Sequence, residues 1–472
     1  MARPDLHPLV ASGRFSRRAL LRGGLAVSLA FATLRRTAAL AGPPAGGGLR
    51  PGPLRRDPNG LLDLPTGFSY RVVSRTGDAM GDGLRVPGAA DGMGAFAGPD
   101  GKTIVVRNHE LVIEQASLGP YGPANELLGK VPAGKLYDAG AAGVPAMGGT
   151  TTFVWDTRTG ELAAQWLSLA GTVRNCAGGP TPWGSWISCE ESVVTPGGAY
   201  AREHGWNFEV PASPTPGLVE PVPLKAMGRF YHEAVAFDPA SGCVFQTEDL
   251  PDGLLYRFVP NDRTRLAAGG RLQAFKACDC KHGIDLRNWT SREAAIGELI
   301  NAEWVDLDDV ESPKDDLHRR GAALGATPFA RGEGMWRGAD GIYVACTSGG
   351  VARRGQIFRY VPSPYEGTPQ EKDEPGTLEL FVEPNDGERL DMGDNLTVAP
   401  WGEVIVCEDG SGEQFMRVVD LNGELHPLAR NALNASELAG ATFSPDGSTL
   451  FVNVYDPGIT LAVTGPWPSA AV

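Results

Sequence analysis

The feature that most constrains this chain is a repeated hairpin pattern with a polar or acidic residue near one end. Each copy passes through a short apolar run, a turn rich in Pro, Asp and Gly, and a second apolar run. The copies begin at Phe96, Asn175, Glu233, Glu333, Asn395 and Ala441. Turns of this composition fix the register of β-hairpins, so the repeat predicts an all-β protein.

The number and spread of the copies suggest blades of a β-propeller, with loops and short helical insertions between them. Strand-like segments such as 255–260 and 356–361 lie between the hairpins and would complete the blades. The 63 Gly and 38 Pro residues supply the many turns that such a fold needs. A long sandwich and a parallel β-helix are alternatives at this stage. A closed propeller leaves no sheet edge that a partner must cover, so we expect a monomer.

The N-terminal residues 1–41 have the pattern of an export signal. Arg17 and Arg18 precede a weakly apolar stretch, and Ala39-Leu40-Ala41 offers a small-x-small cleavage site. This resembles a twin-arginine signal peptide, and a Sec signal or an ordinary basic N-terminus is the alternative. The apolar run is too short to span a bilayer, and no later segment is long enough. We therefore expect the twin-arginine export machinery as a partner, no stable membrane span, and a periplasmic or extracellular location.

The charge of the chain excludes one class of partner. The formal net charge is −14 at pH 7. A chain this acidic binds nucleic acid poorly, because the phosphate backbone would be repelled. Acidity is compatible with metal binding.

Hairpin geometry predicts that the acids at the hairpin ends lie close together. In an antiparallel pair, the first residue of one strand faces the last residue of its partner. If the hairpins surround one axis, their polar ends gather on one face. The candidates for such a site are Glu110, Glu190, Glu191, Glu233, Glu248, Asp249, Glu333, Asp394, Glu408 and Asp409.

So many carboxylates cannot ionise together unless cations neutralise them. Ca²⁺ suits oxygen ligands, and a thiolate from Cys176, which lies in a turn-rich stretch, would add affinity for iron. The alternative is that these acids are solvated turn formers.

Several long motifs resemble one known family. They are RNCAGGPTPWGSWISCEE (174–191), GRFYHEAVAFDP (228–239), QTEDLPDGLLYRFVP (246–260), RGEGMW (331–336), DNLTVAPWGEVIVCEDG (394–410) and ATFSPDGSTLFVN (441–453). Together with the export signal, they resemble the PhoX family of bacterial alkaline phosphatases. The resemblance implies a single six-bladed propeller over residues 67–468, after a linker at 42–66. It also implies two Fe³⁺ and two or three Ca²⁺, and hydrolysis of phosphate monoesters with release of inorganic phosphate.

The same resemblance implies roles for individual residues. Cys176 would be the iron-bridging thiolate of the catalytic centre, and Arg331 would hold the substrate phosphate. The remaining metal ligands would be Glu110, Glu191, Glu248, Glu333 and Asp409. A second cationic contact for the phosphate is not assigned, and Arg174 stays open as a candidate.

Two other functions remain possible on the sequence alone. One is a different calcium-dependent propeller hydrolase of the phytase or lactonase type, which would not need Cys176. The other is a non-enzymatic propeller that binds a partner and holds structural Ca²⁺. No G-x-S-x-G, Walker A or Rossmann motif is present, so the sequence offers no nucleophile elbow or nucleotide loop.

Overall fold

The computed structural model describes residues 48–278 and 284–469. The predicted signal peptide, 1–41, lies outside the described residues. The described chain is all-β, with one short α-helix, α2 (Leu317–Ala323), and a few single-turn 3-10 helices. None of its helices is long and apolar enough to cross a membrane.

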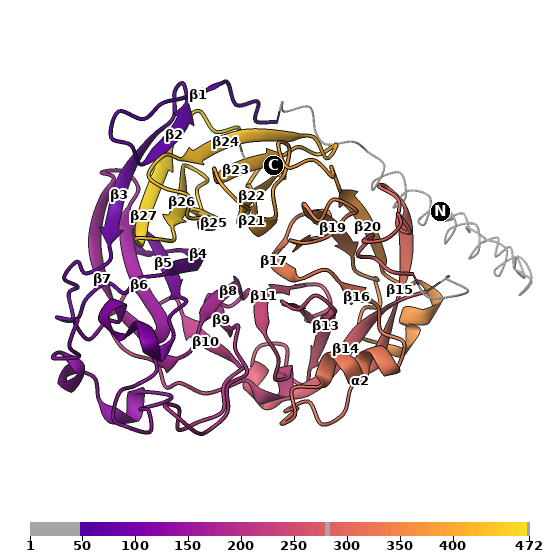
Figure 1. Cartoon of the computed structure of the whole chain (residues 1–472), viewed down its shortest axis with the longest axis horizontal. Helices are drawn as coiled ribbons and strands as arrows, with labels where there is room; N and C mark the ends of the chain where they lie inside the picture. The colour runs from indigo at the N-terminus through magenta and orange to yellow at the C-terminus, as the bar shows by residue number, and fades with distance from the viewer. Residues whose placement is uncertain (1–47, 279–283, 470–472) are drawn as a thin grey trace, which may run out of the picture. The chain divides into compact units, whose positions relative to one another are not determined.

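Three sheets are small antiparallel meanders (Figure 1). The first contains β4 (Ala90–Ala97), β5 (Thr103–His109), β6 (Gly148–Asp156) and β7 (Glu161–Thr172). The second contains β8 (Asn175–Pro180), β9 (Ser185–Glu190) and β10 (Asn207–Pro211). The third contains β25 (Leu438–Phe443), β26 (Thr449–Val454), β27 (Ile459–Thr464) and, from the start of the chain, β3 (Ser69–Arg75).

Two larger sheets complete the fold. One is ordered β1-β2-β24-β23-β22-β21, with β1 (Leu54–Arg55), β2 (Leu62–Pro65), β21 (Gly393–Val398), β22 (Val404–Glu408), β23 (Phe415–Val419) and β24 (Leu425–Asn431). The other has ten strands: β11 (His232–Phe237), β12 (Val244–Glu248), β13 (Gly253–Pro260), β14 (Gly270–Ala277), β15 (Leu299–Asp306), β16 (Pro328–Phe329), β17 (Gly332–Arg337), β18 (Ile342–Cys346), β19 (Gln356–Val361) and β20 (Thr377–Val382). It contains two up-and-down meanders, β11–β14 and β17–β20, which β15 joins by pairing with β14 and β20.

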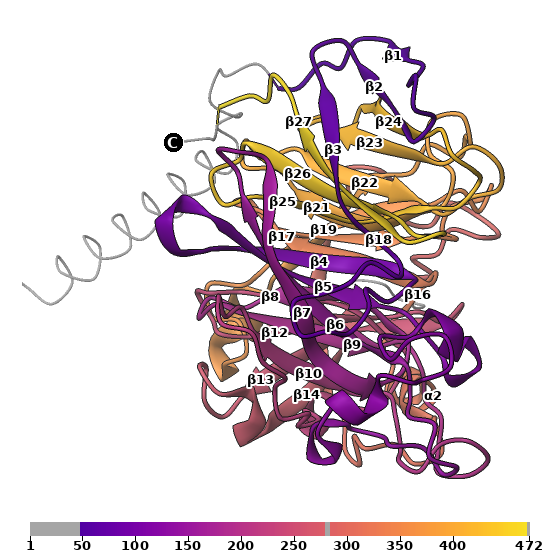
Figure 2. The ribbon, with the colours of Figure 1, turned by 90° about the vertical axis from the view of Figure 1, so that its left-hand side faces the viewer.

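The inner strands form a closed ring. β4 contacts β8, β8 contacts β11, and the contacts continue through β17, β21 and β25 back to β4. Figure 1 shows these strands nearest the centre, with the later strands of each sheet further out, and Figure 2 shows the same sheets from the side. The arrangement is propeller-like, as the sequence pattern predicts.

Every hairpin predicted from the sequence repeat is present. The pairs are β4 with β5, β8 with β9, β11 with β12, β17 with β18, β21 with β22, and β25 with β26. Each pair is the innermost hairpin of its meander. The polar ends of the hairpins therefore lie near the centre of the ring.

The start of the described chain completes two late sheets. β3 pairs with β27, and β2 pairs with β24. Residues 54–55 and 62–65, inside the segment predicted as a linker, thus belong to a sheet. Their composition, rich in Pro and Gly, hid this, but Leu62 is buried and Asp63 accepts hydrogen bonds from Arg430.

The sheets are buried because they pack face to face. All residues of β5, β12, β18, β22 and β26 are buried. Apolar side chains of both faces fill the space between neighbouring sheets, as in the cluster that includes Phe245, Phe275 and Phe358. Removing this apolar area from water supplies the main stabilisation of the ring.

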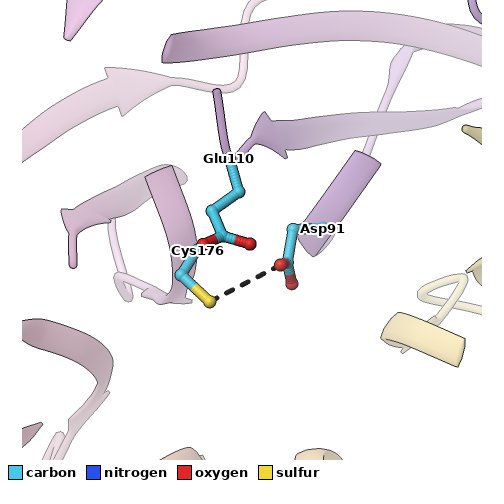
Figure 3. Close-up of side chains that lie close together, drawn as sticks. All are labelled: Asp91, Glu110 and Cys176. Carbon is cyan, nitrogen blue, oxygen red and sulfur yellow. Dashed lines mark hydrogen bonds between the residues drawn. The ribbon is translucent and has the colours of Figure 1, made fainter. Parts of the chain in front are cut away.

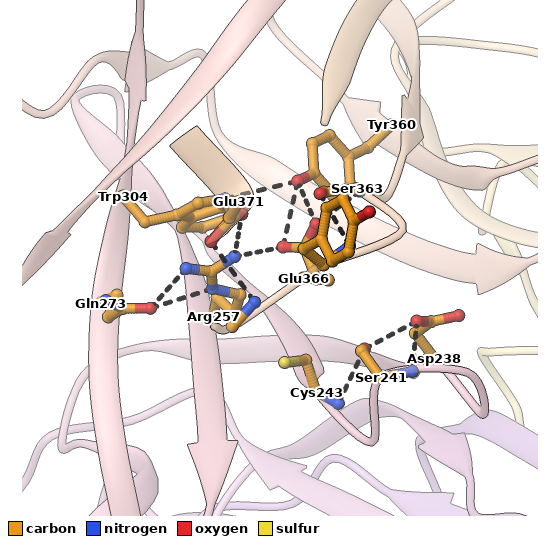
Figure 4. Close-up of polar contacts among 12 residues, drawn as sticks. Asp238, Ser241, Cys243, Arg257, Gln273, Trp304, Tyr360, Ser363, Glu366 and Glu371 are labelled. Atoms are coloured by element: carbon orange, nitrogen blue, oxygen red, sulfur yellow. Dashed lines mark hydrogen bonds and ion pairs between the residues drawn. The ribbon is translucent and has the colours of Figure 1, made fainter. Parts of the chain in front are cut away.

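A buried polar network fastens the two meanders of the ten-stranded sheet (Figure 4). Arg257 of β13 forms ion pairs with Glu366 and Glu371, which lie in the connection between β19 and β20. Its guanidinium also lies 4.4 Å from the ring centre of Trp304 in β15 and donates to Gln273 of β14. The buried charge is fully paired, so it joins elements that are far apart in sequence.

A small residue is required where the last inner strand meets the first. Gly440 of β25 has φ +66°, and an added Cβ would lie 2.2 Å from the carbonyl oxygen of Asp91 in β4. We expect Gly440→Ala to lower the free energy of unfolding by about 3 kcal/mol, from overpacking and left-handed strain. Gly129→Ala, with nothing within 4 Å, is the control and should change it by less than about 1 kcal/mol. Urea unfolding measures both, and equal effects would contradict the prediction.

Candidate metal centre

Each inner strand carries a β-bulge close to its first residue. The register shifts between Ala90 and Met93 in β4, and in the same way in β8, β11, β17, β21 and β25. Two residues of the inner strand then face one residue of its partner, and such a bulge re-aims a side chain. In the first five strands the first bulged residues are Asp91, Cys176, Glu233, Glu333 and Asp394. All five can ligate a metal.

The second bulged residue is small in most strands, because neighbouring bulges touch. A Cβ on Gly92 would lie 2.6 Å from the Cα of Ala177. A Cβ on Gly334 would lie 2.6 Å from the backbone nitrogen of Leu396. Close approach of the bulges brings the side chains before them, such as Asp91 and Glu333, near their neighbours.

The residue that follows each second strand is held by one recurring backbone hydrogen bond. Its backbone N–H donates to the carbonyl oxygen of the residue directly before the inner strand of the same hairpin. The pairs are Glu110 to Ala89, Glu191 to Arg174, Asp249 to Tyr231, Thr347 to Arg331, Asp409 to Met392 and Tyr455 to Glu437. Four of these donors are acids, so the same turn brings a second layer of carboxylates to the ring.

These side chains form a continuous series of metal-ligating groups. In each of four groups the ligand atoms lie within 4.8 Å of one another. The groups are Asp91-Glu110-Cys176, Cys176-Glu191-Glu233, Glu233-Glu333-Asp394 and Asp394-Asp409-Glu437. Consecutive groups share a residue, and we call the whole set the axial cluster. Figure 3 shows the first group, in which the Cys176 Sγ lies 3.5 Å from an oxygen of Asp91.

The electrostatics of the axial cluster disfavour charge in the absence of cations. Burial, followed by the charges of Glu110 and Asp394, raises the pKa of Asp91 well above its usual range. Burial and then neighbouring carboxylates likewise raise the pKa values of Glu233 and of the Cys176 thiol. Bound cations reverse this logic, because they stabilise carboxylate and thiolate.

The surroundings of Glu233 show whether the axial cluster is suited to binding metal ions. Its side chain is fully buried, and neither carboxylate oxygen has a hydrogen-bond partner among the described residues. An isolated buried carboxylate is strongly unfavourable, whereas a buried carboxylate on a cation is not. With hard oxygen donors around it and one sulfur beside it, Glu233 has the surroundings of a metal ligand.

Two arginines lie at the exposed side of the axial cluster. Arg331 donates to both carboxylate oxygens of Asp249, at 2.8 and 2.7 Å, and to Glu333 at 2.8 Å. Arg174 donates to Glu110 at 2.7 Å and to Glu191 at 2.5 Å. The site therefore has two guanidinium groups on the side of the acids that is nearer to solvent.

The second strands of three hairpins end at two consecutive acids, and the first acid of each pair does not belong to the axial cluster. Successive strand residues point to opposite faces, so Glu190, Glu248 and Glu408 turn away from the axial cluster. Glu408 pairs with Arg417, and Glu190 bonds His204 at 2.6 Å. These glutamates anchor the ends of the second strands.

The structure brings together most of the residues predicted from the motifs. Glu110, Cys176, Glu191, Glu333 and Asp409 all lie in the axial cluster. Arg331 lies next to it through its bond to Glu333.

Glu248 is not brought to the axial cluster. One of its oxygens accepts bonds from the N–H of Leu254 and the hydroxyl of Tyr256. The backbone bond shared with Glu191 and Asp409 is made by Asp249, so Asp249 is the residue in the equivalent position. Aligning CEE, TED and CED by their last acid would have identified it.

Two cluster residues were missed by sequence reasoning. Asp91 is followed by Gly92 and Met93, as Glu333 is followed by Gly334 and Met335, and this shared pattern was the available signal. Glu437 precedes β25 instead of lying in a bulge, so no hairpin pattern points to it.

Comparisons with known proteins place this geometry in context. A family model described as alkaline phosphatase PhoX matches residues 49–458. The structure of Pseudomonas fluorescens PhoX in complex with vanadate, a transition state analogue, is similar in fold, with a TM-score of 0.64 and 17% identity. That match covers 89% of this chain and 98% of the other.

A gluconolactonase from Xanthomonas campestris matches with a TM-score of 0.42 and 11% identity, over 89% of this chain and 99% of the other. A likeness this weak carries no argument about function. No curated protein matches the chain.

The two glutamates at the end of the β11–β12 hairpin give a matched test of the axial cluster. We expect Glu233→Gln to lower the metal content by about one ion per chain, because a neutral amide binds cations more weakly than a carboxylate. Glu248→Gln, equally buried but outside the four groups, should keep the full metal content. Elemental analysis of the purified variants measures this, and metal loss from Glu248→Gln alone would reverse the assignment.

His204 gives a pH test of the anchor at Glu190. Burial lowers the pKa of His204, but Glu190 and Asp138 raise it more, from 6.5 to about 9. The stabilisation is therefore present below pH 6.5 and is lost as the pH rises through 9. The stability difference between wild type and His204→Gln should shrink by about 3 kcal/mol between pH 6 and pH 10. Urea unfolding across this range measures it, and a constant difference would show that His204 stays neutral.

Proposed function

The chain belongs to the PhoX family of alkaline phosphatases, and on that premise we propose that it hydrolyses phosphate monoesters at the axial cluster and releases inorganic phosphate. The observation that carries this proposal is the continuous series of carboxylates around Cys176, with unpartnered Glu233 at its centre. A structural role alone would not require acids to share this buried space, because like charges there repel each other.

We infer that the cofactors are two Fe³⁺ and two or three Ca²⁺. The support is the donor set: carboxylate oxygens suit Ca²⁺, and Cys176 lies within 4.8 Å of donors from two of the groups, where a bridging thiolate would be needed. The proposed ligands are Glu110, Cys176, Glu191, Glu333 and Asp409 from the motifs, joined by Asp91, Glu233, Asp394 and Glu437. When bound, these cations supply Lewis-acid binding of the phosphoryl oxygens and reverse the negative charge of the site.

The role of Arg331 follows from its position. Its side chain is 32% exposed, while the carboxylates of Asp249 and Glu333 under it are 9% and 3% exposed. A guanidinium presents a planar fork that matches two phosphate oxygens. Asp249 holds the guanidinium by a two-point contact at Nε and Nη2, so Arg331 is positioned to bind the substrate phosphate through Nη1.

We also propose the finer features of architecture and location. Six blades are supported by the six inner hairpins and by the division of the ten-stranded sheet at β15. The support for export by the twin-arginine machinery, and for a periplasmic or extracellular location, is the sequence of residues 1–41. The closed ring of inner strands supports a monomer.

Metal content and turnover test the proposed function together. We expect the exported protein to carry iron and calcium and to hydrolyse p-nitrophenyl phosphate, with activity lost in chelator and restored by metal. Cys176→Ser should lose iron and activity, because a hydroxyl replaces the bridging thiolate. Cys346→Ala, at a buried cysteine of β18 outside the axial cluster, is the control and should keep both. A metal-replete protein without turnover would exclude the proposed activity.

A further inference from the structure

Arg174 and Arg331 occupy equivalent positions in two blades. Arg174 directly precedes β8 and Arg331 directly precedes β17, with φ values of 45° and 55°. Ala89 and Met392 have the same left-handed backbone before β4 and β21. Since Ala89 and Met392 adopt this backbone conformation at the equivalent positions, the turn itself does not require arginine. The two guanidiniums therefore need another explanation.

Both arginines use the same edge of the guanidinium to hold carboxylates. Arg174 uses Nε and Nη2 for Glu110 and Glu191, and Arg331 uses Nε and Nη2 for Asp249 and Glu333. Within residues 48–278 and 284–469, neither Nη1 has a hydrogen-bond partner. Each arginine thus has Nε and Nη2 occupied by acids and Nη1 left to donate.

Both arginine side chains are more exposed than the acids that they hold. The Arg174 side chain is 39% exposed, whereas its partners Glu110 and Glu191 are each 10% exposed. Arg331 is 32% exposed above its own buried partners. An anion that approaches the cluster from solvent meets guanidinium groups before carboxylates.

The two arginines belong to one connected rim. The carboxyl of Glu191, which binds Arg174, lies near the carboxyl of Asp249, which binds Arg331. Two neighbouring acids, Glu191 and Asp249, thus lie between the guanidiniums. Their positions are therefore fixed relative to each other and to the axial cluster.

We propose that Arg174 is a second phosphate-binding residue, which acts together with Arg331 and makes the site selective for phosphate monoesters over diesters. This inference rests on the proposed function and adds to it a second phosphate-binding residue that discriminates between two kinds of ester. At alkaline pH a monoester phosphate carries two negative charges, whereas a diester carries one. Two fixed cations favour the doubly charged group, because each forms a charge-assisted hydrogen bond with it.

The test compares two substrates and one ligand across a small set of variants. Wild type, Arg174→Ala, Arg174→Lys and Arg174→Gln are assayed with p-nitrophenyl phosphate and with bis(p-nitrophenyl) phosphate. Inorganic phosphate binding is measured by calorimetry, and metals are counted in every sample. Arg353→Ala is the control, since this exposed arginine stacks on Trp289 at 4.0 Å and contacts no acid of the axial cluster.

We expect Arg174→Ala to lower kcat/KM for the monoester by about a hundredfold and for the diester by about tenfold or less. Phosphate affinity should fall by about tenfold or more, at unchanged metal content, and Arg174→Lys should restore part of it. Arg353→Ala should match wild type.

Three results would overturn the proposal. One is an unchanged ratio of monoester to diester activity, and another is unchanged phosphate affinity. The third is equal loss of metals in all Arg174 variants, since that would make Arg174 only a counter-charge for Glu110 and Glu191. Failure of the proposed function is separate: wild type with full metals would then hydrolyse neither substrate, and phosphate calorimetry would still report on Arg174.

Discussion

Mutual repulsion among buried carboxylates is the constraint on which the rest of this structure depends. The axial cluster gathers acids from all the inner hairpins, or from directly beside them, into a space where burial already disfavours charge. A fold that merely had to be stable would place apolar side chains there. The ring instead holds these groups close together, and the proposed cations would offset the repulsion.

The backbone determines where the metal-ligating side chains of the axial cluster lie. Two devices repeat around the ring: a bulge that re-aims one side chain, and a hydrogen bond that fixes the residue after the second strand. Both rest on antiparallel strands whose faces are buried by neighbouring sheets, so their positions vary little. The arginines add a second layer, because they hold the outer acids while keeping part of each guanidinium exposed. Rigid elements thus position the ligands, and short turns position the charges that face solvent.

The sequence predicted the hairpins and the acids near their ends because both depend on local patterns. Turn residues and apolar alternation are visible over about fifteen residues, so all the inner hairpins could be found. Long motifs identified the family and most cluster members.

What the sequence could not reveal depends on register. Whether Glu248 or Asp249 points to the axis is decided by a one-residue shift, and such a shift moves every side chain to the other face. Asp91 required a comparison between blades, and Glu437 lies outside the hairpin pattern. The pairing of β2 and β3 with late strands joins residues hundreds of positions apart, which no local pattern reports.

That pairing has a consequence for the order of events during synthesis. The last sheet draws strands from both ends of the described chain, and Glu437 enters the axial cluster only with that sheet. Until the ribosome has made β27, β3 has no partner, and until β25 is made the inner ring stays open. A nascent chain therefore cannot assemble the whole axial cluster, and the proposed cations would be fully bound only by the finished polypeptide.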